Sequence, residues 1–232
     1  MAVVLFGVLM TLGDWQVHRR VWKLDLIARV DQRIHADPVA PPGRSQWPDI
    51  NAANDEYLRV RISGKFLNSA ETRVYASTQL GDGYWVMTPL RTADGYIVLI
   101  NRGFIPTDLP ATAQFRKMSR PPDSVTITGL LRLTEPHGGF LRSNQPAAQR
   151  WYSRDVAAIA AAQGLPRQDV APYFIDADAT LNPGGWPVGG LTVIHFYNNH
   201  LIYAITWYTL ALMVLGAGIR FTRDEWRLRH PG

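Results

Sequence analysis

The feature that most constrains this chain is an uncharged apolar stretch close to its C-terminus. Residues Leu201 to Ile219 (LIYAITWYTLALMVLGAGI) contain no charged side chain. A helix of about 20 apolar residues is long enough to cross the hydrocarbon core of a bilayer. Four arginines follow at once, and positive charge marks the cytoplasmic side of a span: Arg220, Arg223, Arg227 and Arg229. We predict a transmembrane helix over residues 198–220 and a cytoplasmic basic tail over residues 221–232; the alternative is a buried helix of a soluble domain.

The N-terminus predicts a second, shorter span. Met1 to Leu12 is apolar, although about 12 residues are fewer than the roughly 20 that a span needs. A signal peptide is the alternative, yet no basic segment precedes the stretch and no small-x-small cleavage pattern follows it. We therefore predict a transmembrane helix over residues 1–16, with Trp15 and Trp22 at the membrane interface. This topology places three cations on the outer side, against the usual charge rule: Arg19, Arg20 and Lys23.

Short alternating or β-branched segments, bounded by Gly, Asp or Pro, fill the middle of the chain and predict strands. They are Leu58–Ile62, Val74–Ala76, Trp85–Met87, Tyr96–Ile100, Val125–Leu133 and Pro172–Ile175. Asp82-Gly83 and Asp94-Gly95 are typical of hairpin turns, so the strands are expected to pair mainly antiparallel.

One helix is predicted in the same region, from Val156 to Ala162. Ser153 is expected to cap it, Asp155 favours its positive end, and Gly164 stops it. Residues 17–49 are predicted to form an amphipathic segment and a proline-rich linker, and residues 50–190 a single extramembrane domain. The fold class is thus α+β: a mainly antiparallel β extramembrane domain with at least one helix, flanked by two transmembrane helices.

Little in the sequence points to catalysis. The chain has no cysteine, which excludes disulfides, thiolate metal sites and cysteine nucleophiles. It contains no nucleophile elbow, zinc-protease helix, phosphate-binding loop or dinucleotide fingerprint. The net charge of +5 is attributed to arginines that flank the apolar ends, and not to a nucleic-acid surface. Asp176 and Asp178 are interpreted as solvated surface carboxylates, and we predict that the protein is not an enzyme.

Histidine is the remaining reactive residue type. His200 stands where the domain enters the last span, and Tyr203, Trp207 and Tyr208 follow it at helical spacing. A neutral imidazole at this depth can ligate haem iron, and aromatic rings nearby can hold a porphyrin. The alternative is an aromatic belt with a polar histidine at the level of the lipid head groups.

Three further side chains are weaker candidates for a haem site. His18 follows the first span and is expected near the same membrane surface as the start of the last one. His195 could reach the iron only if Phe196 to Asn199 folds back, and is otherwise a surface loop histidine. Arg102 ends a predicted strand before Gly103, which allows a positive φ, and it could reach a haem propionate. An ion pair of Arg102 with an acidic residue inside the domain is the favoured alternative.

Several short motifs occur in a fixed order along the chain. They include Gly13-Asp14-Trp15-Gln16, Val60 to Phe66, Gly83-Tyr84 with Thr88-Pro89, Val98 to Pro106, Gly129 to Arg132, Asn144-Gln145-Pro146, and Asn199-His200-Leu201 through Trp207-Tyr208. In order and spacing they resemble the Surfeit locus protein 1 family, the cytochrome c oxidase assembly factors of bacterial and mitochondrial inner membranes.

The resemblance implies two terminal spans in a bacterial inner membrane, with both termini cytoplasmic and the domain in the periplasm. It implies an assembly factor for a haem-copper terminal oxidase, which binds or presents haem a during maturation of subunit I. The implied partners are that subunit, membrane lipid and haem a synthase. The histidine implicated in the family falls on His200, and we expect Tyr203, Trp207 and Arg102 as further haem contacts. A haem-independent scaffold that stabilises subunit I is the alternative.

Overall fold

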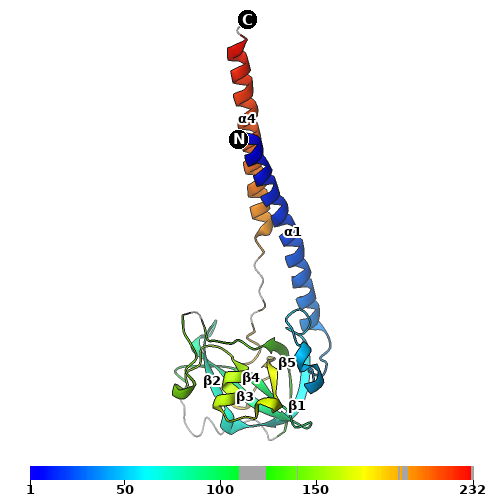
Figure 1. Cartoon of the computed structure of the whole chain (residues 1–232). Coiled ribbons are helices and arrows are strands. Elements are labelled where there is room, and N and C mark those ends of the chain that lie inside the picture. Colours follow the sequence, from blue (N-terminus) through cyan, green and yellow to red (C-terminus); the bar gives the residue numbers. More distant parts are fainter. Residues whose placement is uncertain (110–123, 140, 193, 195–197, 231–232) are drawn as a thin grey trace. The chain divides into compact units, whose positions relative to one another are not determined.

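The chain, seen in a computed structural model, divides into two compact units (Figure 1). The structure describes residues 1–109, 124–139, 141–192, 194 and 198–230. Met1–Asp31 and Ile194–Gly232 form one unit, which holds most of two long helices, and Gln32–Val193 form the other, which holds a β-sheet.

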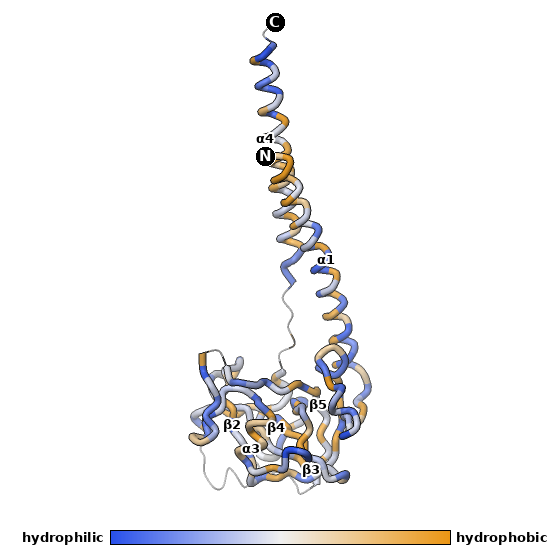
Figure 2. Tube along the Cα trace, viewed as in Figure 1, coloured by the Kyte–Doolittle hydropathy of each residue, from blue (hydrophilic) through white to orange (hydrophobic). Residues whose placement is uncertain are grey.

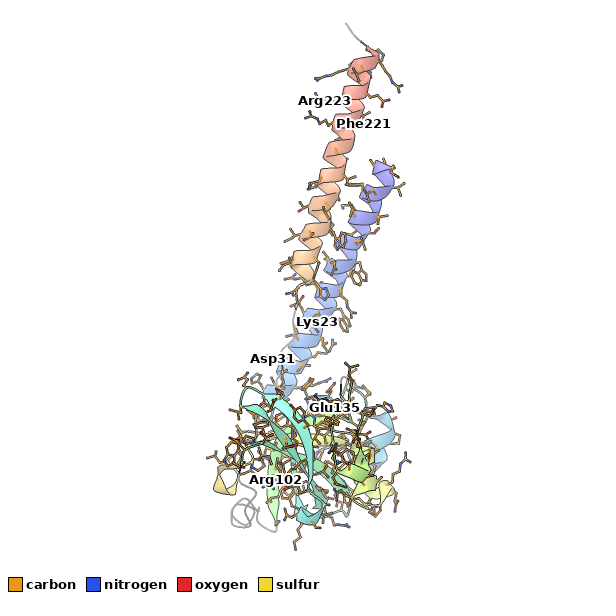
Figure 3. All side chains as sticks on the ribbon, turned by 90° about the vertical axis from the view of Figure 1, so that its left-hand side faces the viewer. Lys23, Asp31, Arg102, Glu135, Phe221 and Arg223 are labelled. Atoms are coloured by element: carbon orange, nitrogen blue, oxygen red, sulfur yellow. The ribbon has the colours of Figure 1, made fainter. Side chains whose placement is uncertain are left out.

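The two long helices, α1 (Ala2–His35) and α4 (His200–Arg229), lie side by side and antiparallel within the first unit (Figures 1 and 3). By length and composition α4 is apolar enough to cross a membrane, and only 11% of its apolar window is buried, unlike the core helix of a soluble protein. Within the described residues, α4 is the one helix that meets this criterion. Figure 2 shows its apolar part giving way to hydrophilic residues toward the C-terminal end. α1 is continuous, so residues 17–35 belong to the same helix as the apolar N-terminus.

The sheet of the second unit closes on itself. Its strands are β1 (Arg59–Phe66), β2 (Thr72–Thr78), β3 (Gly81–Thr92), β4 (Ile97–Pro106), β5 (Val125–Leu133) and β6 (Val170–Ala177). They are ordered β1-β5-β6-β4-β3-β2, and an additional pairing of β1 with β3 completes a ring that leaves β2 outside. All pairs are antiparallel except β4 with β6, which are parallel. The predicted α+β class with a sheet-rich domain is confirmed, whereas the closure was not predicted.

Closure depends on the length of β3 and on a glycine in β1. The first part of β3 pairs with β2, from Thr78↔Gly81 to Thr72↔Met87. Its last residues pair with β1, from Gly64↔Thr92 to Phe66↔Leu90. A Cβ at Gly64 would overlap the main-chain carbonyl of Arg91, so the two strands approach this closely because residue 64 has no side chain.

Two apolar clusters lie on opposite faces of the sheet. The cluster inside the ring comprises Val60, Ile62, Phe66, Leu90, Tyr96, Val98, Ile100, Leu131, Ala171, Tyr173 and Ile175. The outer cluster lies beneath helix α3 (Val156–Ala162) and comprises Val74, Met87, Ile97, Leu99, Trp151, Val156, Ile159, Ala160, Val170 and Phe174. β4 contributes alternate residues to both clusters, which explains why its sequence is continuously apolar from Ile97 to Ile100.

The proline-rich segment before β1 packs on the domain as well. It contains a 3₁₀ helix, η1 (Arg44–Asp49), and Val39 forms a bridge with Val60 of β1. The hydroxyl of Tyr173 donates to the carbonyl of Pro42 at 2.7 Å, and Arg44 pairs with Asp169 at 2.8 Å. Burial raises the pKa of Tyr173, so its hydroxyl stays protonated as the donor.

One of the two predicted hairpin turns was wrong, and the other is confirmed. Asp82-Gly83 lies inside β3, paired with Ser77 and Ala76, and the turn before it consists of Gln79 and Leu80. The pair Asp94-Gly95 does form the turn between β3 and β4, where Gly95 has a φ of +80°.

The cap of α3 also differs from the prediction. Asp155, not Ser153, is the N-cap, and its carboxylate accepts from the backbone N–H of Ala158 at 3.0 Å. The hydroxyl of Ser153 instead accepts from the N–H of Gly138 and the amide of Asn144, each at 3.0 Å. Ser153 therefore stabilises the preceding loop.

Asp176 at the end of β6 is buried, which corrects its interpretation as a surface carboxylate. Its side chain is 3% exposed. It accepts hydrogen bonds from the Asn101 amide at 2.8 Å, the Thr192 hydroxyl at 3.0 Å and Arg154 Nη1 at 3.0 Å. Arg132 Nη1 approaches it at 3.4 Å. Donors from β4, β5 and two loops thus converge on this one carboxylate.

Each arginine around Asp176 holds a second carboxylate. Arg154 Nε donates to Glu135 at 3.1 Å, and Arg132 Nε lies 3.4 Å from Glu56 (Glu135 is labelled in Figure 3). Burial by itself would raise the pKa of Glu135, but the hydrogen bonds and charge of Arg154 outweigh it and hold that pKa below its ordinary value. Burial opposes the charge on Arg154 too, yet the Asp176 and Glu135 carboxylates raise its pKa. Both shifts favour the charged forms of Glu135 and Arg154, which therefore form an ion pair within the network.

We predict that Asp176→Ala lowers the free energy of unfolding by about 3–5 kcal/mol, because it leaves buried guanidinium groups without their shared carboxylate. Asp178→Ala is the matched control: Asp178 is half-buried and accepts one backbone hydrogen bond, from Thr180, so a loss of about 1 kcal/mol is expected. Urea unfolding of the full chain in detergent, followed by tryptophan fluorescence, measures both. Equal losses for the two variants would show that the network adds no stability of its own.

Candidate functional site

The face that α1 and α4 share combines small residues with two polar contacts. Its buried members are Leu9, Gly13 and Gln16 on α1 and Ala204 and Ala211 on α4. A Cβ at Gly13 would overlap the ring of Tyr208, so the absence of a side chain lets the two helices approach closely. Small residues in this position are typical of helix pairs in lipid.

Two hydrogen bonds join the helices at this face. Nδ1 of His200, the first residue of α4, lies 2.8 Å from Oε1 of Gln16. The hydroxyl of Tyr208, two helical turns further along α4, donates to Asp14 Oδ1 at 2.6 Å. Gln16 is only 9% exposed, so its amide oxygen is largely screened from water.

His200 could ligate a haem iron through Nε2. Its side chain is half-buried, and its recorded hydrogen bond engages Nδ1. Nε2 of His200 makes no hydrogen bond with the residues that the structure describes. A histidine that ligates a metal through one ring nitrogen commonly donates the other N–H to an oxygen acceptor, which is the role open to Gln16 here.

The aromatic residues predicted near His200 fall into two groups. Tyr208 is turned toward α1, where it meets Gly13 and Asp14. Tyr203 is 54% exposed, and Trp207, one turn after it, is half-buried. Tyr203 and Trp207 could therefore contact a flat ligand on the surface of α4. Tyr208 instead pairs the two helices.

Among the described residues, the side chain that contacts the ring of His200 is an amide and not a second histidine. Nδ1 of the exposed His18 lies 2.8 Å from the carbonyl of Asp14 in its own helix, and the side chain that meets His200 is Gln16. His195 lies outside the described residues. Within those residues, no group of three or more His, Cys, Asp or Glu could hold a metal ion.

Arg102 belongs to the other unit and does not contribute to the geometry around His200. Its side chain is 5% exposed, with Nη1 3.7 Å from Glu71 Oε2 and the guanidinium 5.4 Å from the ring of Phe66 (Arg102 is labelled in Figure 3). Burial lowers the pKa of Arg102, and the Glu71 charge acts in the opposite direction. Gly103, next to it, has the positive φ expected, +128°. This arrangement corresponds to the ion pair that was the alternative to a propionate contact.

Sequence reasoning missed Gln16 as the partner of His200. The sequence does contain a signal for this contact, since each helix carries three residues spaced by four and then three positions. They are Leu9, Gly13 and Gln16 on α1, and Ala204, Tyr208 and Ala211 on α4. This spacing places each set on one helical face. Two such stripes, each with small and polar members, indicate an interhelical contact.

Comparison with known proteins covers both units. The model of the SURF1 family matches residues 3–212, which include most of α1, the whole sheet and the His200 end of α4. The chain belongs to the SURF1 family. Surfeit locus protein 1 of Rattus norvegicus is 34% identical over 215 residues, which cover 86% of this chain and 67% of the relative. Surfeit locus protein 1 of Homo sapiens is 34% identical over 226 residues, which cover 90% of this chain and 71% of the relative. A SURF1-like protein of Monosiga brevicollis is 33% identical over 234 residues, which cover 95% of this chain and 84% of the relative.

Membership of the SURF1 family confirms the resemblance drawn from the sequence. The matched region contains every residue of the helix contact from Leu9 to Gln16 and from His200 to Ala211. The motifs at the two ends of the SURF1 match, Gly13 to Gln16 and Asn199 to Tyr208, are therefore the two sides of one contact.

We predict that cysteines at positions 2 and 218 form an intramolecular disulfide under mild oxidation. A Cβ at Gly218 would lie 3.6 Å from Ala2 Cβ, within the range of disulfides, and the chain has no other cysteine. Adding Gly13→Leu should lower the yield, because the side chain pushes Tyr208 away. Gly7→Leu is the matched control, since a Cβ there meets nothing within 4 Å. Gel mobility of the full chain in membranes reports the yield, and equal yields in the two backgrounds would contradict the close approach at Gly13.

Proposed function

We propose that this protein is a non-enzymatic assembly factor for a haem-copper terminal oxidase, which holds haem a through His200 while subunit I matures. The observation that carries the proposal is the arrangement at the start of α4, where Nδ1 of His200 meets the buried Gln16 and Nε2 has no hydrogen bond among the described residues. Haem a supplies the redox-active iron of the oxidase. The protein's own contribution is to bind and orient it.

His200 would ligate the iron, and the neighbouring rings of α4 would flank the porphyrin. Tyr203 presents an exposed ring, and Trp207 lies one turn further along the same helix. Arg102 is less suited to a propionate, because it is nearly buried and its guanidinium faces Glu71.

We further propose that α1 and α4 both span a bacterial inner membrane, with the domain in the periplasm and both termini in the cytoplasm. The arginines that follow the apolar part of α4 support this orientation. Trp15 and Trp22 of α1 are 57% and 46% exposed, and Arg19 lies 4.1 Å over the Trp22 ring, as suits a membrane interface. Partners in this setting are oxidase subunit I, haem a synthase and membrane lipid.

The haem proposal predicts that the wild-type protein, purified in detergent from cells that make haem a, carries that haem and that His200→Ala loses it. His18→Ala is the matched control, since His18 is exposed and bonds to its own helix. Absorption spectra and the ratio of haem to protein measure the result. Wild-type protein that co-purifies with no haem under these conditions would remove haem binding from the proposal.

A second function, a scaffold that binds subunit I without haem, is favoured by one surface of the domain. Tyr75 lies 6.3 Å from both Tyr84 and Tyr152 between ring centroids, and Arg142 stands 5.6 Å over Tyr75 and 5.4 Å over Tyr152. We call these four residues the tyrosine–arginine surface. Its three tyrosines line an open cavity of about 380 Å³. Tyrosine and arginine are enriched at protein interfaces and at their energetic hot spots.

If the scaffold function holds, Arg142→Ala should weaken crosslinking to subunit I by about tenfold, as expected for a hot-spot arginine. Arg61→Ala, an exposed arginine on β1, is the control and should leave crosslinking unchanged. His200→Ala should then retain both the crosslink and a normal haem content of the oxidase. Crosslinking that is insensitive to Arg142 would count against this surface as the scaffold contact.

A further inference from the structure

Gln16 is placed to control which nitrogen of His200 carries the proton. The recorded contact joins His200 Nδ1 to the amide oxygen of Gln16 at 2.8 Å. An amide oxygen only accepts, so the hydrogen of this bond must lie on Nδ1. In neutral imidazole one nitrogen is protonated and the other carries the lone pair, so Nε2 is left as the ligating atom.

The two interhelical hydrogen bonds differ in their consequence for a ligand. The second hydrogen bond joins the same two helices: the Tyr208 hydroxyl donates to Asp14 Oδ1 at 2.6 Å. Neither of these atoms is a histidine ring nitrogen. It therefore contributes to helix pairing alone. The Gln16–His200 bond contributes to pairing and also selects a tautomer, and Gln16 is the more buried of the two acceptor residues.

We propose that Gln16 is the positioning residue of the haem site: by accepting from Nδ1 it holds His200 in the tautomer that ligates iron through Nε2. This inference rests on the proposed haem function and extends it to a residue on the other helix. An oxygen acceptor behind a ligating histidine fixes the orientation of the ring and raises its basicity as a ligand. The site therefore needs both helices, although only α4 supplies the ligand.

The nature of the acceptor should then tune the bound iron. Gln16→Leu removes the acceptor and leaves the ring free to take either tautomer. Gln16→Glu supplies a charged acceptor, which draws the Nδ1 proton more strongly and makes Nε2 a stronger donor to iron. A stronger donor favours the ferric state, so the glutamate variant lowers the reduction potential of the haem.

The experiment uses the full chain purified in detergent from cells that make haem a. We expect Gln16→Leu to reduce haem affinity by about 10- to 100-fold, the usual effect of losing such an acceptor. Gln16→Glu should retain haem with a lower midpoint potential. Tyr208→Phe, which removes the neighbouring interhelical hydrogen bond, is the control and should leave the spectrum and the potential as in the wild type. The disulfide between positions 2 and 218 verifies that the helices stay paired in each variant.

A measurement without haem tests the same inference. Selective ¹⁵N-histidine labelling of the haem-free protein reports the protonated ring nitrogen, which should be Nδ1 of His200 in the wild type and a mixture of both in Gln16→Leu. If wild-type protein binds haem and His200→Ala does not, but the Gln16 variants keep the wild-type affinity and potential, the inference is wrong and the proposed function stands. If the wild type binds no haem, the proposed function and this inference fail together.

Discussion

The carboxylate of Asp176 lies at a point where segments from across the domain must meet. It is buried at the end of β6 and receives donors from Asn101 of β4, Arg132 of β5, Arg154 before α3 and Thr192 after the sheet. A buried carboxylate without partners is costly, so the sheet is stable only when these donors are in place together. The same contact holds Thr192, in the segment that leads toward α4, against the domain. The Asp176 carboxylate thus holds the strands of the sheet together and also fixes the segment that leaves the sheet after β6.

The strands could be predicted from the sequence because each depends on local pattern. β-branched and aromatic residues between turn formers marked all six strands, and the α+β class followed. Closure of the sheet could not be predicted, because it depends on a pairing of Gly64 with Thr92 that no local pattern records. The burial of Asp176 was missed for a related reason. Its neighbour Asp178 has the same chemistry and a similar setting in the sequence, and only partners 16 to 75 residues away distinguish the two.

The candidate site shows the same division between local and distant information. His200 and its aromatic neighbours share one helix, so their spacing was visible in the sequence. The partner of His200 lies 184 residues away on α1, and its identity follows only from the antiparallel pairing of the helices. Gly13 makes that pairing close enough for a hydrogen bond, because its missing side chain admits the ring of Tyr208. A small residue on one helix thus determines which polar groups meet on the other.

The position of β6 in the sheet has a consequence for how the protein is made. β6 lies between β5 and β4, yet it is the last of the described strands along the chain, from Val170 to Ala177. As synthesis proceeds from the N-terminus, the first five strands are complete before the strand that must join them exists. The ring can close only after residue 177 has emerged, and α4 begins later, at His200, after the 3₁₀ helix η5 (Pro183–Gly185). Domain closure therefore comes late, because the pairings of β4 and β5 with β6 are delayed until β6 has been synthesised.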